Sequence, residues 1–164
     1  MERFSDFISS YKKQLEKGDI QKAYEGLVKY VMRVKSIFSR NKSDRFSVGN
    51  VSPGYMDFTY FPFFDEFLRE RKLRLGMVFN HNKVRFEIWL MGQNKDIQKR
   101  YWNHLKTTKW NKARMTMPKY SVLEAVLVEN PDFENLDELT HQIEIELIKV
   151  SNEIIGYLKT NDIH

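Results

Sequence analysis

The chain has 164 residues, a formal net charge of +5 and no cysteine. This length fits a single domain, residues 1–164, that buries about 70% of the surface exposed by its unfolded form. The lack of cysteine excludes disulfides, thiolate nucleophiles and cysteine-based zinc sites. Neither the start of the chain nor any apolar run has the character of a signal peptide or of a span of about 18 residues. We therefore expect a cytoplasmic protein that does not enter a membrane.

The charges are unevenly distributed along the chain. Residues 72–119 hold 12 lysines and arginines against two acids, whereas residues 120–164 hold ten acids against two lysines. A basic segment of this kind suits an anionic partner. Alternatively, the acidic C-terminal segment packs across the basic one and complements it within the chain. Composition alone leaves both interpretations open.

Residues 1–40 are predicted to form a helical hairpin. Apolar side chains recur at a spacing of three and four residues from Phe4 to Leu15 and again from Ile20 to Phe38, which is typical of amphipathic helices. Gly18 lies between the two stretches, where a helix commonly ends. The following segment, residues 41–54, is polar and rich in turn formers, and it is expected to be a loop.

The remaining residues, 55–164, are predicted to form a sheet with helices. Apolar Met56, Phe58 and Tyr60 alternate with polar residues, which indicates a first strand. Pro62 is expected to open a short helix over residues 63–71, because proline is well accommodated in the first turn of a helix.

Two alternating stretches, residues 73–79 and 84–90, predict a β-hairpin with its turn at His81 and Asn82. That turn would pair Phe79 with Val84, Met77 with Phe86, Leu75 with Ile88 and Leu73 with Leu90. All four pairs are apolar, and a slip by one residue would place apolar residues opposite polar ones. The opposite face of the hairpin would carry Arg74, Arg85, Glu87 and Trp89.

After the hairpin, Asn94 is expected to cap a helix that ends near Thr108, and residues 110–119 form a basic loop. A strand follows over residues 122–128, and a last helix runs from Leu136 to about Lys159. The order of elements from the first strand is β-α-β-β-α-β plus a long C-terminal helix. It predicts an α+β fold with a four-stranded, mostly antiparallel sheet, and it is compatible with a ferredoxin-like arrangement.

The sequence has no motif for metal or cofactor chemistry. Its four histidines, His81, His104, His141 and His164, lack the spacing of metal ligands, and no phosphate loop, dinucleotide fingerprint or nucleophile elbow occurs. We therefore expect no metal, no cofactor and no catalytic residue.

The polar faces of the strands supply the first candidate ligand-binding site. It consists of Asp57, Arg74, Arg85, Glu87 and Trp89. Restriction-endonuclease-like enzymes hold magnesium with an Asp and a Glu-x-Lys on neighbouring strands. Here Trp89 stands where that lysine belongs, so at most a degraded, binding relative is expected. A surface ion pair of Glu87 with an arginine is the simpler interpretation.

The basic segment supplies a second candidate site, for an anion or a nucleic acid. Its members are Lys99, Arg100, Lys106, Trp110, Lys112 and Arg114. Cations contact phosphates and aromatic rings stack on bases, so this composition suits a single strand of nucleic acid. A solvated basic face beside ordinary core aromatics is the alternative.

The last helix suggests a third role. Its apolar stripe is widened by Ile145, Ile148 and Ile155, and such a wide stripe suits a homodimer contact. A homodimeric interaction protein is therefore an alternative to a binding module.

Several stretches of the chain resemble a family of uncharacterised bacterial proteins, a domain of unknown function. They are residues 54–64 (GYMDFTYFPFF), 85–90 (RFEIWL), 92–94 (GQN), 101–102 (YW) and 128–133 (VENPDF). The resemblance covers nearly the whole chain and implies a bacterial cytoplasmic protein. It implies no activity, cofactor or site residue. The residues themselves favour a non-enzymatic binding module for an anionic ligand or nucleic acid.

Overall fold

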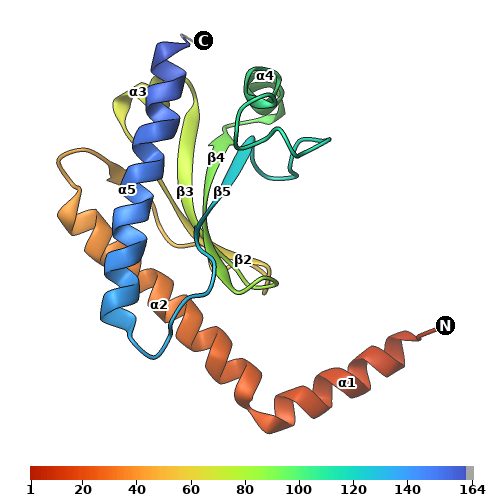
Figure 1. Ribbon diagram of the computed structural model, residues 1–164. Coiled ribbons are helices and arrows are strands. Elements are labelled where there is room, and N and C mark those ends of the chain that lie inside the picture. Colours follow the sequence, from red (N-terminus) through yellow and green to blue (C-terminus); the bar gives the residue numbers. More distant parts are fainter. Residues whose placement is uncertain (162–164) are drawn as a thin grey trace.

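The computed structural model describes residues 1–161 and has an α+β fold (Figure 1). Its helices are α1 (Phe4–Lys17), α2 (Asp19–Asn41), α3 (Glu66–Glu70), α4 (Lys95–Leu105) and α5 (Leu136–Thr160). Its strands are β1 (Ser47–Val48), β2 (Phe58–Phe64), β3 (Leu73–Asn80), β4 (Arg85–Gly92) and β5 (Leu123–Val128). The predicted fold class is confirmed.

The strands form one antiparallel sheet in the order β1-β2-β3-β4-β5. The predicted sheet had four strands, and β1 is an additional short strand inside residues 41–54, which were expected to be a loop. A ferredoxin-like arrangement is wrong, because β2 and β3 are direct antiparallel neighbours. A split βαβ unit would instead place another strand between them.

Strand β2 is longer than predicted and presents the opposite face to the core. It continues through Pro62, whose carbonyl accepts a hydrogen bond from Gly49 N at 2.8 Å. The N–H group that proline lacks is tolerated near a sheet edge. Because the strand runs on to Phe64, the helix predicted over residues 63–71 is shorter and consists only of α3. Thr59, Phe61 and Phe63 are fully buried. Aromatic residues occur at both even-numbered and odd-numbered positions of β2, so they lie on both faces of the strand. The alternation of apolar and polar residues therefore does not show which face packs on the main core.

The hairpin of β3 and β4 has the predicted faces but a register shifted by two residues. The pairs along the core face are Leu73 with Gly92, Leu75 with Leu90, Met77 with Ile88 and Phe79 with Phe86. All four predicted pairs are therefore wrong. The turn takes four residues, 81–84, and Val84 adopts a positive φ of 50° within it. A two-residue shift keeps each side chain on its face, which is why the alternation fits both registers.

The main core lies between the sheet and the long helices. Figure 1 shows α2 and α5 on the same face of the sheet. The buried residues of α2 and α5 join one apolar cluster with the inward face of the strands. Helix α4 begins where β4 ends and contributes Ile97, Tyr101 and Leu105 to the same cluster. Its Asn94 cap is confirmed, since the Asn94 side chain accepts a hydrogen bond from Ile97 N at 3.0 Å.

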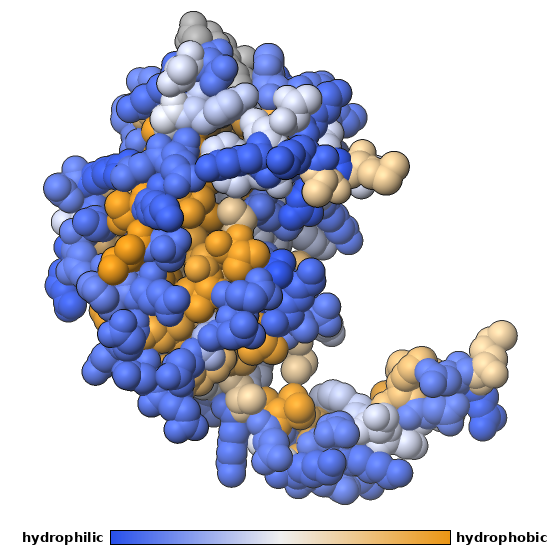
Figure 2. All heavy atoms as spheres, in the orientation of Figure 1, coloured by the Kyte–Doolittle hydropathy of each residue, from blue (hydrophilic) through white to orange (hydrophobic). Residues whose placement is uncertain are grey.

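The first two helices form as predicted but do not pack as a hairpin. Gly18 ends α1 in the left-handed conformation, with φ of 82°. Helix α1 has no buried residue, and it extends away from the rest of the chain with its apolar side chains visible (Figures 1 and 2). Phe4, Phe7, Ile8 and Tyr11 are all exposed.

The stripe of α5 that suggested a homodimer is mostly used within the chain. Ile155 is buried and Ile148 packs against the main core, whereas Ile145 is exposed. A homodimer therefore stays a prediction, but most of the α5 surface that suggested it is buried within the chain. Within residues 1–161, no helix combines the length and the apolar character that crossing a membrane requires.

Candidate ligand-binding site

The face of the sheet opposite the main core carries a second, smaller apolar cluster. Strand alternation places Val78, Trp89 and Met91 on this face, and Phe58 and Tyr60 of β2 pack against them. We call this face of the sheet the open face. The Phe58 and Trp89 rings meet edge to face, with centroids 4.7 Å apart, which is a favoured geometry for aromatic pairs.

A pocket of about 670 Å³ lies over this cluster, and we call it the outer pocket. Trp89, Met91, Phe58 and Tyr60 line its apolar part. Other lining residues are Tyr55, which is strongly exposed, Tyr120, which is half exposed, and the cations Arg74 and Lys119. The pocket thus combines aromatic surface with positive charge.

Two glycines affect the outer pocket by close approach, Gly54 as a lining residue and Gly76 through its contact with the lining residue Met91. Gly76 pairs with Trp89 across the strands, and a Cβ added to it would lie 2.7 Å from Met91 Cε. Gly54 lines the pocket with φ of 74°, and an added Cβ would lie 2.1 Å from the Phe58 carbonyl oxygen. A side chain is therefore strained at Gly54 and crowded at Gly76.

A buried carboxylate fixes the orientation of Trp89. Glu87 is only 2% exposed. The Trp89 indole donates to its Oε1 at 2.8 Å, while Arg85 Nε and Asn80 Nδ2 donate to its Oε2 at 2.7 and 3.1 Å. A buried charge needs such compensation. Glu87 thus pairs with an arginine as the simpler interpretation expected, but it is buried and positions the indole rather than lining the pocket.

A second carboxyl group lies across the sheet from Trp89. Glu124 of β5 is its register partner. Burial raises the pKa of Glu124, and the attraction of Arg114, whose Nη2 lies 3.5 Å from Oε2, opposes that rise. The basic residue of this pair is one of the predicted nucleic-acid contacts, so its charge is partly used within the chain.

Asp57 holds the loop that borders the outer pocket. Its Oδ1 accepts hydrogen bonds from Tyr55 N at 2.8 Å and Phe58 N at 2.6 Å. These two backbone donors keep the pKa of Asp57 below its usual value. Thr59 adds a further tie, since its hydroxyl donates to the Pro53 carbonyl at 2.7 Å. Asp57 therefore lines the pocket with a carboxylate that already serves the loop.

The two cations of the outer pocket have few partners. The side chain of Arg74 is exposed and, within residues 1–161, takes part in no hydrogen bond or ion pair. Lys119 has its Nζ 5.1 Å from the centroid of the Tyr120 ring, which is itself half exposed. Both charges remain accessible to an anion.

Of the first predicted site, Asp57, Arg74 and Trp89 line the outer pocket, whereas Arg85 and Glu87 form the support behind Trp89. The carboxylates of Asp57 and Glu87 have separate structural partners. Within the described part of the chain, no group of three histidine, cysteine, aspartate or glutamate side chains is placed to hold a metal ion.

The second predicted site is more dispersed. Lys99, Arg100, Lys106 and Lys112 are exposed, and none of the six residues lines the outer pocket. Trp110 packs against the main core and meets the Tyr157 ring at 6.0 Å between centroids. The alternative of internal charge complementation holds in part, since Lys109 Nζ lies 3.1 Å from a Glu153 oxygen of α5.

The three histidines within residues 1–161 do not share a site. His81 lies in the hairpin turn, where burial lowers its pKa, and His104 and His141 are exposed. His164 lies outside the described residues.

Sequence reasoning missed most of the pocket lining. The alternation that predicts the first strand does not show that Phe58 and Tyr60 lie away from the main core, and Tyr120 and Lys119 belong to a loop without regular periodicity. The aromatic residues at even-numbered and odd-numbered positions of β2 were the one signal that both faces of this strand contact other side chains. The stretch from Arg69 to Arg74 (RERKLR) also has four cations in six residues, and this local density of charge is a signal for the hollows beside β3.

Comparison with known proteins gives a family but no activity. The profile of a domain of unknown function (DUF7000) matches residues 4–158. No curated protein and no solved structure matches the chain. The matched range includes α1 and nearly all of α5, so the whole described fold lies within the family domain except for its ends.

Proposed function

The chain belongs to the DUF7000 family, and because that family brings no activity we propose a function from its own pocket. The protein is a binding module for an anionic ligand that carries a planar ring, such as a nucleotide. The outer pocket carries this proposal, because it joins an aromatic lining to two accessible cations. A cytoplasmic location and a bacterial source accompany the proposal as predictions.

The aromatic lining supports the planar ring. Trp89 is held by Glu87 at 2.8 Å and by the Phe58 ring, so its orientation is set before a ligand arrives. Tyr120 is half exposed and its ring centroid lies 6.4 Å from that of Phe58. A flat ring that enters beside Tyr120 gains stacking without a large change in the lining.

The cations support the anionic part. Arg74 is exposed within the lining, and its planar guanidinium matches the geometry of a phosphate or carboxylate. Lys119 adds a second charge from the loop that follows α4. Two cations from different elements fix the orientation of an anion better than one.

The pocket supports binding rather than catalysis. Asp57 is the acidic residue of its lining, and two backbone N–H groups already occupy one of its oxygens. The same bonds lower its pKa, whereas a general base that works near neutral pH needs a raised one.

Calorimetric titration with thymidine 5′-monophosphate tests the proposal. We expect the nucleotide to bind, and thymidine and inorganic phosphate, which each carry one half of it, to bind much more weakly. Tyr120→Ala should weaken nucleotide binding by about fivefold or more, since loss of a stacking ring costs about 1–3 kcal/mol per base.

Tyr11→Ala is the matched control, because Tyr11 is likewise exposed but lies on α1, away from the pocket lining. It should leave binding unchanged. No binding of the nucleotide at millimolar concentration would contradict the proposal, and so would phosphate binding as tightly as the nucleotide.

A further inference from the structure

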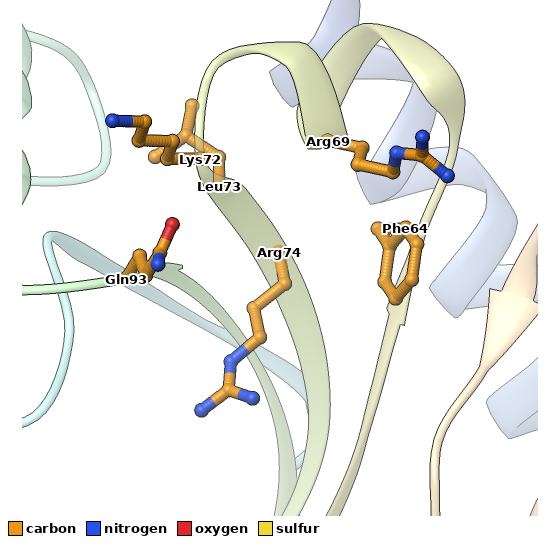
Figure 3. A pocket seen from close by; sticks show the side chains of 6 residues that line it. All are labelled: Phe64, Arg69, Lys72, Leu73, Arg74 and Gln93. Carbon is orange, nitrogen blue, oxygen red and sulfur yellow. The ribbon is translucent and has the colours of Figure 1, made fainter.

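One smaller hollow adjoins the outer pocket and a second adjoins the first, and shared cations link the three in series. The first, of about 250 Å³, is lined by Arg69, Lys72, Arg74 and Gln93 among others (Figure 3). Arg74 therefore lines both this hollow and the outer pocket. The second, also about 250 Å³, is lined by Arg71, Lys72 and Arg100 and by one acid, Glu70, among others, so Lys72 lines both small hollows.

The cations along this path are largely unneutralised. Within residues 1–161, Lys72, Arg74 and Arg100 have no ion pair. Arg69 and Arg71 each have a carboxylate 3.9 Å away, and the Arg71 guanidinium also stacks on the Phe67 ring at 3.7 Å from its centroid. Figure 3 shows Arg69, Lys72 and Arg74 around the first hollow, with their charged ends pointing in different directions. Positive charge left without partners in adjoining hollows is a feature that anions can use.

The backbone at the centre of the path is held in an uncommon conformation. Lys72 has φ of 60°, which is costly for a residue with a side chain. Its carbonyl accepts a hydrogen bond from Gln93 N at 3.0 Å, which ties this turn to the end of β4. The side chain of Lys72 therefore projects from a fixed turn, which lies between the two small hollows.

We propose that the ligand of the outer pocket is a single strand of nucleic acid, whose next phosphates lie in the two small hollows. This inference rests on the proposed function, because it takes the ring in the outer pocket to be a base. The path supplies what a strand needs and a mononucleotide does not: further cations beyond Arg74, at Lys72 and then at Arg100.

The observations favour a nucleic acid over an acidic peptide. Both ligands would use the cations, but only the nucleic acid repeats a flat ring that can stack against an aromatic lining. An unpaired base is required, because a base within a duplex keeps its faces stacked on its neighbours. The inference therefore specifies a single strand.

Titration with oligothymidylates of one to eight nucleotides tests this inference. We expect the affinity to rise by about tenfold or more between one and four nucleotides and then to level off as the path is filled. The double variant Lys72→Glu/Arg100→Glu should lose this gain with length while it still binds thymidine 5′-monophosphate. Its plot of log affinity against log salt should be shallower by about 1.4, since each phosphate contact contributes about 0.7 for a single strand.

The double variant Lys22→Glu/Lys149→Glu is the matched control. Both lysines are exposed on α2 and α5, outside the three hollows, and the change in net charge is the same. It should keep the gain with length. Equal losses in the two double variants would show a non-specific effect of charge and would overturn the inference.

The remaining outcomes separate the inference from the proposed function. Binding of the mononucleotide without any gain with length would overturn the inference alone. Failure of the mononucleotide and of every oligonucleotide would overturn both. If a duplex or a polyglutamate of equal charge bound as tightly as the single strand, the single-strand inference would be wrong and the nucleotide pocket would stand.

Discussion

The two faces of the sheet are built from the same strands but differ in the groups that they bury. The face under α2 and α5 is mainly apolar, with Phe61, Phe63 and Leu75 fully buried and Thr59 as a buried polar residue at its edge. The open face is also largely buried along β4, yet it contains the carboxylate of Glu87 and the exposed guanidinium of Arg74. Burial alone therefore does not distinguish a core from a site.

The difference lies in what compensates each buried group. On the core face most buried side chains are apolar and need only apolar neighbours, while the buried hydroxyl of Thr59 donates a hydrogen bond to the Pro53 carbonyl at 2.7 Å. On the open face, Glu87 accepts hydrogen bonds from three donors. One of these donors is the indole of Trp89, whose orientation is fixed by this bond. A polar network of this kind specifies the position of a ring, which is what a pre-formed ligand pocket needs.

The largest expected effect separates the faces on one strand. Phe61→Ala should lower the free energy of unfolding by about 4 kcal/mol, since a buried phenylalanine leaves a cavity. Tyr60→Ala, one residue away on the open face, should cost clearly less because its ring is only half-buried. Urea unfolding measures both values. Equal losses would show that the open face is a second core and would break the comparison.

The next effect concerns the buried ion pair. Arg85→Met should lower the free energy of unfolding by about 3 kcal/mol, because it leaves Glu87 buried without its cation. Arg114→Met is the control, since its pair with Glu124 is longer, at 3.5 Å, and more exposed. It should cost about 1 kcal/mol or less. Similar losses for both variants would mean that the Glu87 network has no special part in the open face.

The same contrast explains what the sequence could reveal. Periodicity predicted α2, α4 and α5 and the core face of the hairpin, because helix and strand burial repeat along the chain. It did not predict the register, since Val84 fits the alternation both as a strand residue and as the end of a four-residue turn. The outer pocket was found only in part, because Lys119 and Tyr120 reach it through tertiary packing of an irregular loop.

A smaller effect on stability, but a clear one on binding, is expected at Arg74. Arg74→Ala should change the free energy of unfolding by about 0.5 kcal/mol or less, since the side chain is exposed and has no partner within residues 1–161. Binding of thymidine 5′-monophosphate should weaken by about tenfold, the loss expected for a charge-assisted hydrogen bond. Arg40→Ala, at an exposed position of α2, should affect neither measurement. Unchanged binding in Arg74→Ala would remove this residue from the proposed site.

The smallest effect is expected at His81, where the loop of the outer pocket meets the core face. Thr59, a fully buried residue, donates its hydroxyl proton to the Pro53 carbonyl, so the contact of 2.7 Å with His81 Nε2 requires the imidazole to donate. A further proton must then go to Nδ1. Burial disfavours that charge and lowers the pKa of His81, although the nearby Asp57 carboxylate favours it.

The sign of the pH dependence follows from this lowered pKa. In the unfolded chain His81 takes up a proton near pH 6.5, whereas in the folded chain it does so only at lower pH. Below about pH 6.5 the unfolded state therefore binds more protons, and stability is lost as the pH falls. His81→Asn removes this contribution, so the melting temperature of the variant should fall less between pH 7.5 and 5.5 than that of the wild type. Asp57 titrates below this window because its pKa is lowered, and a parallel fall in both proteins would show that His81 is not the group responsible.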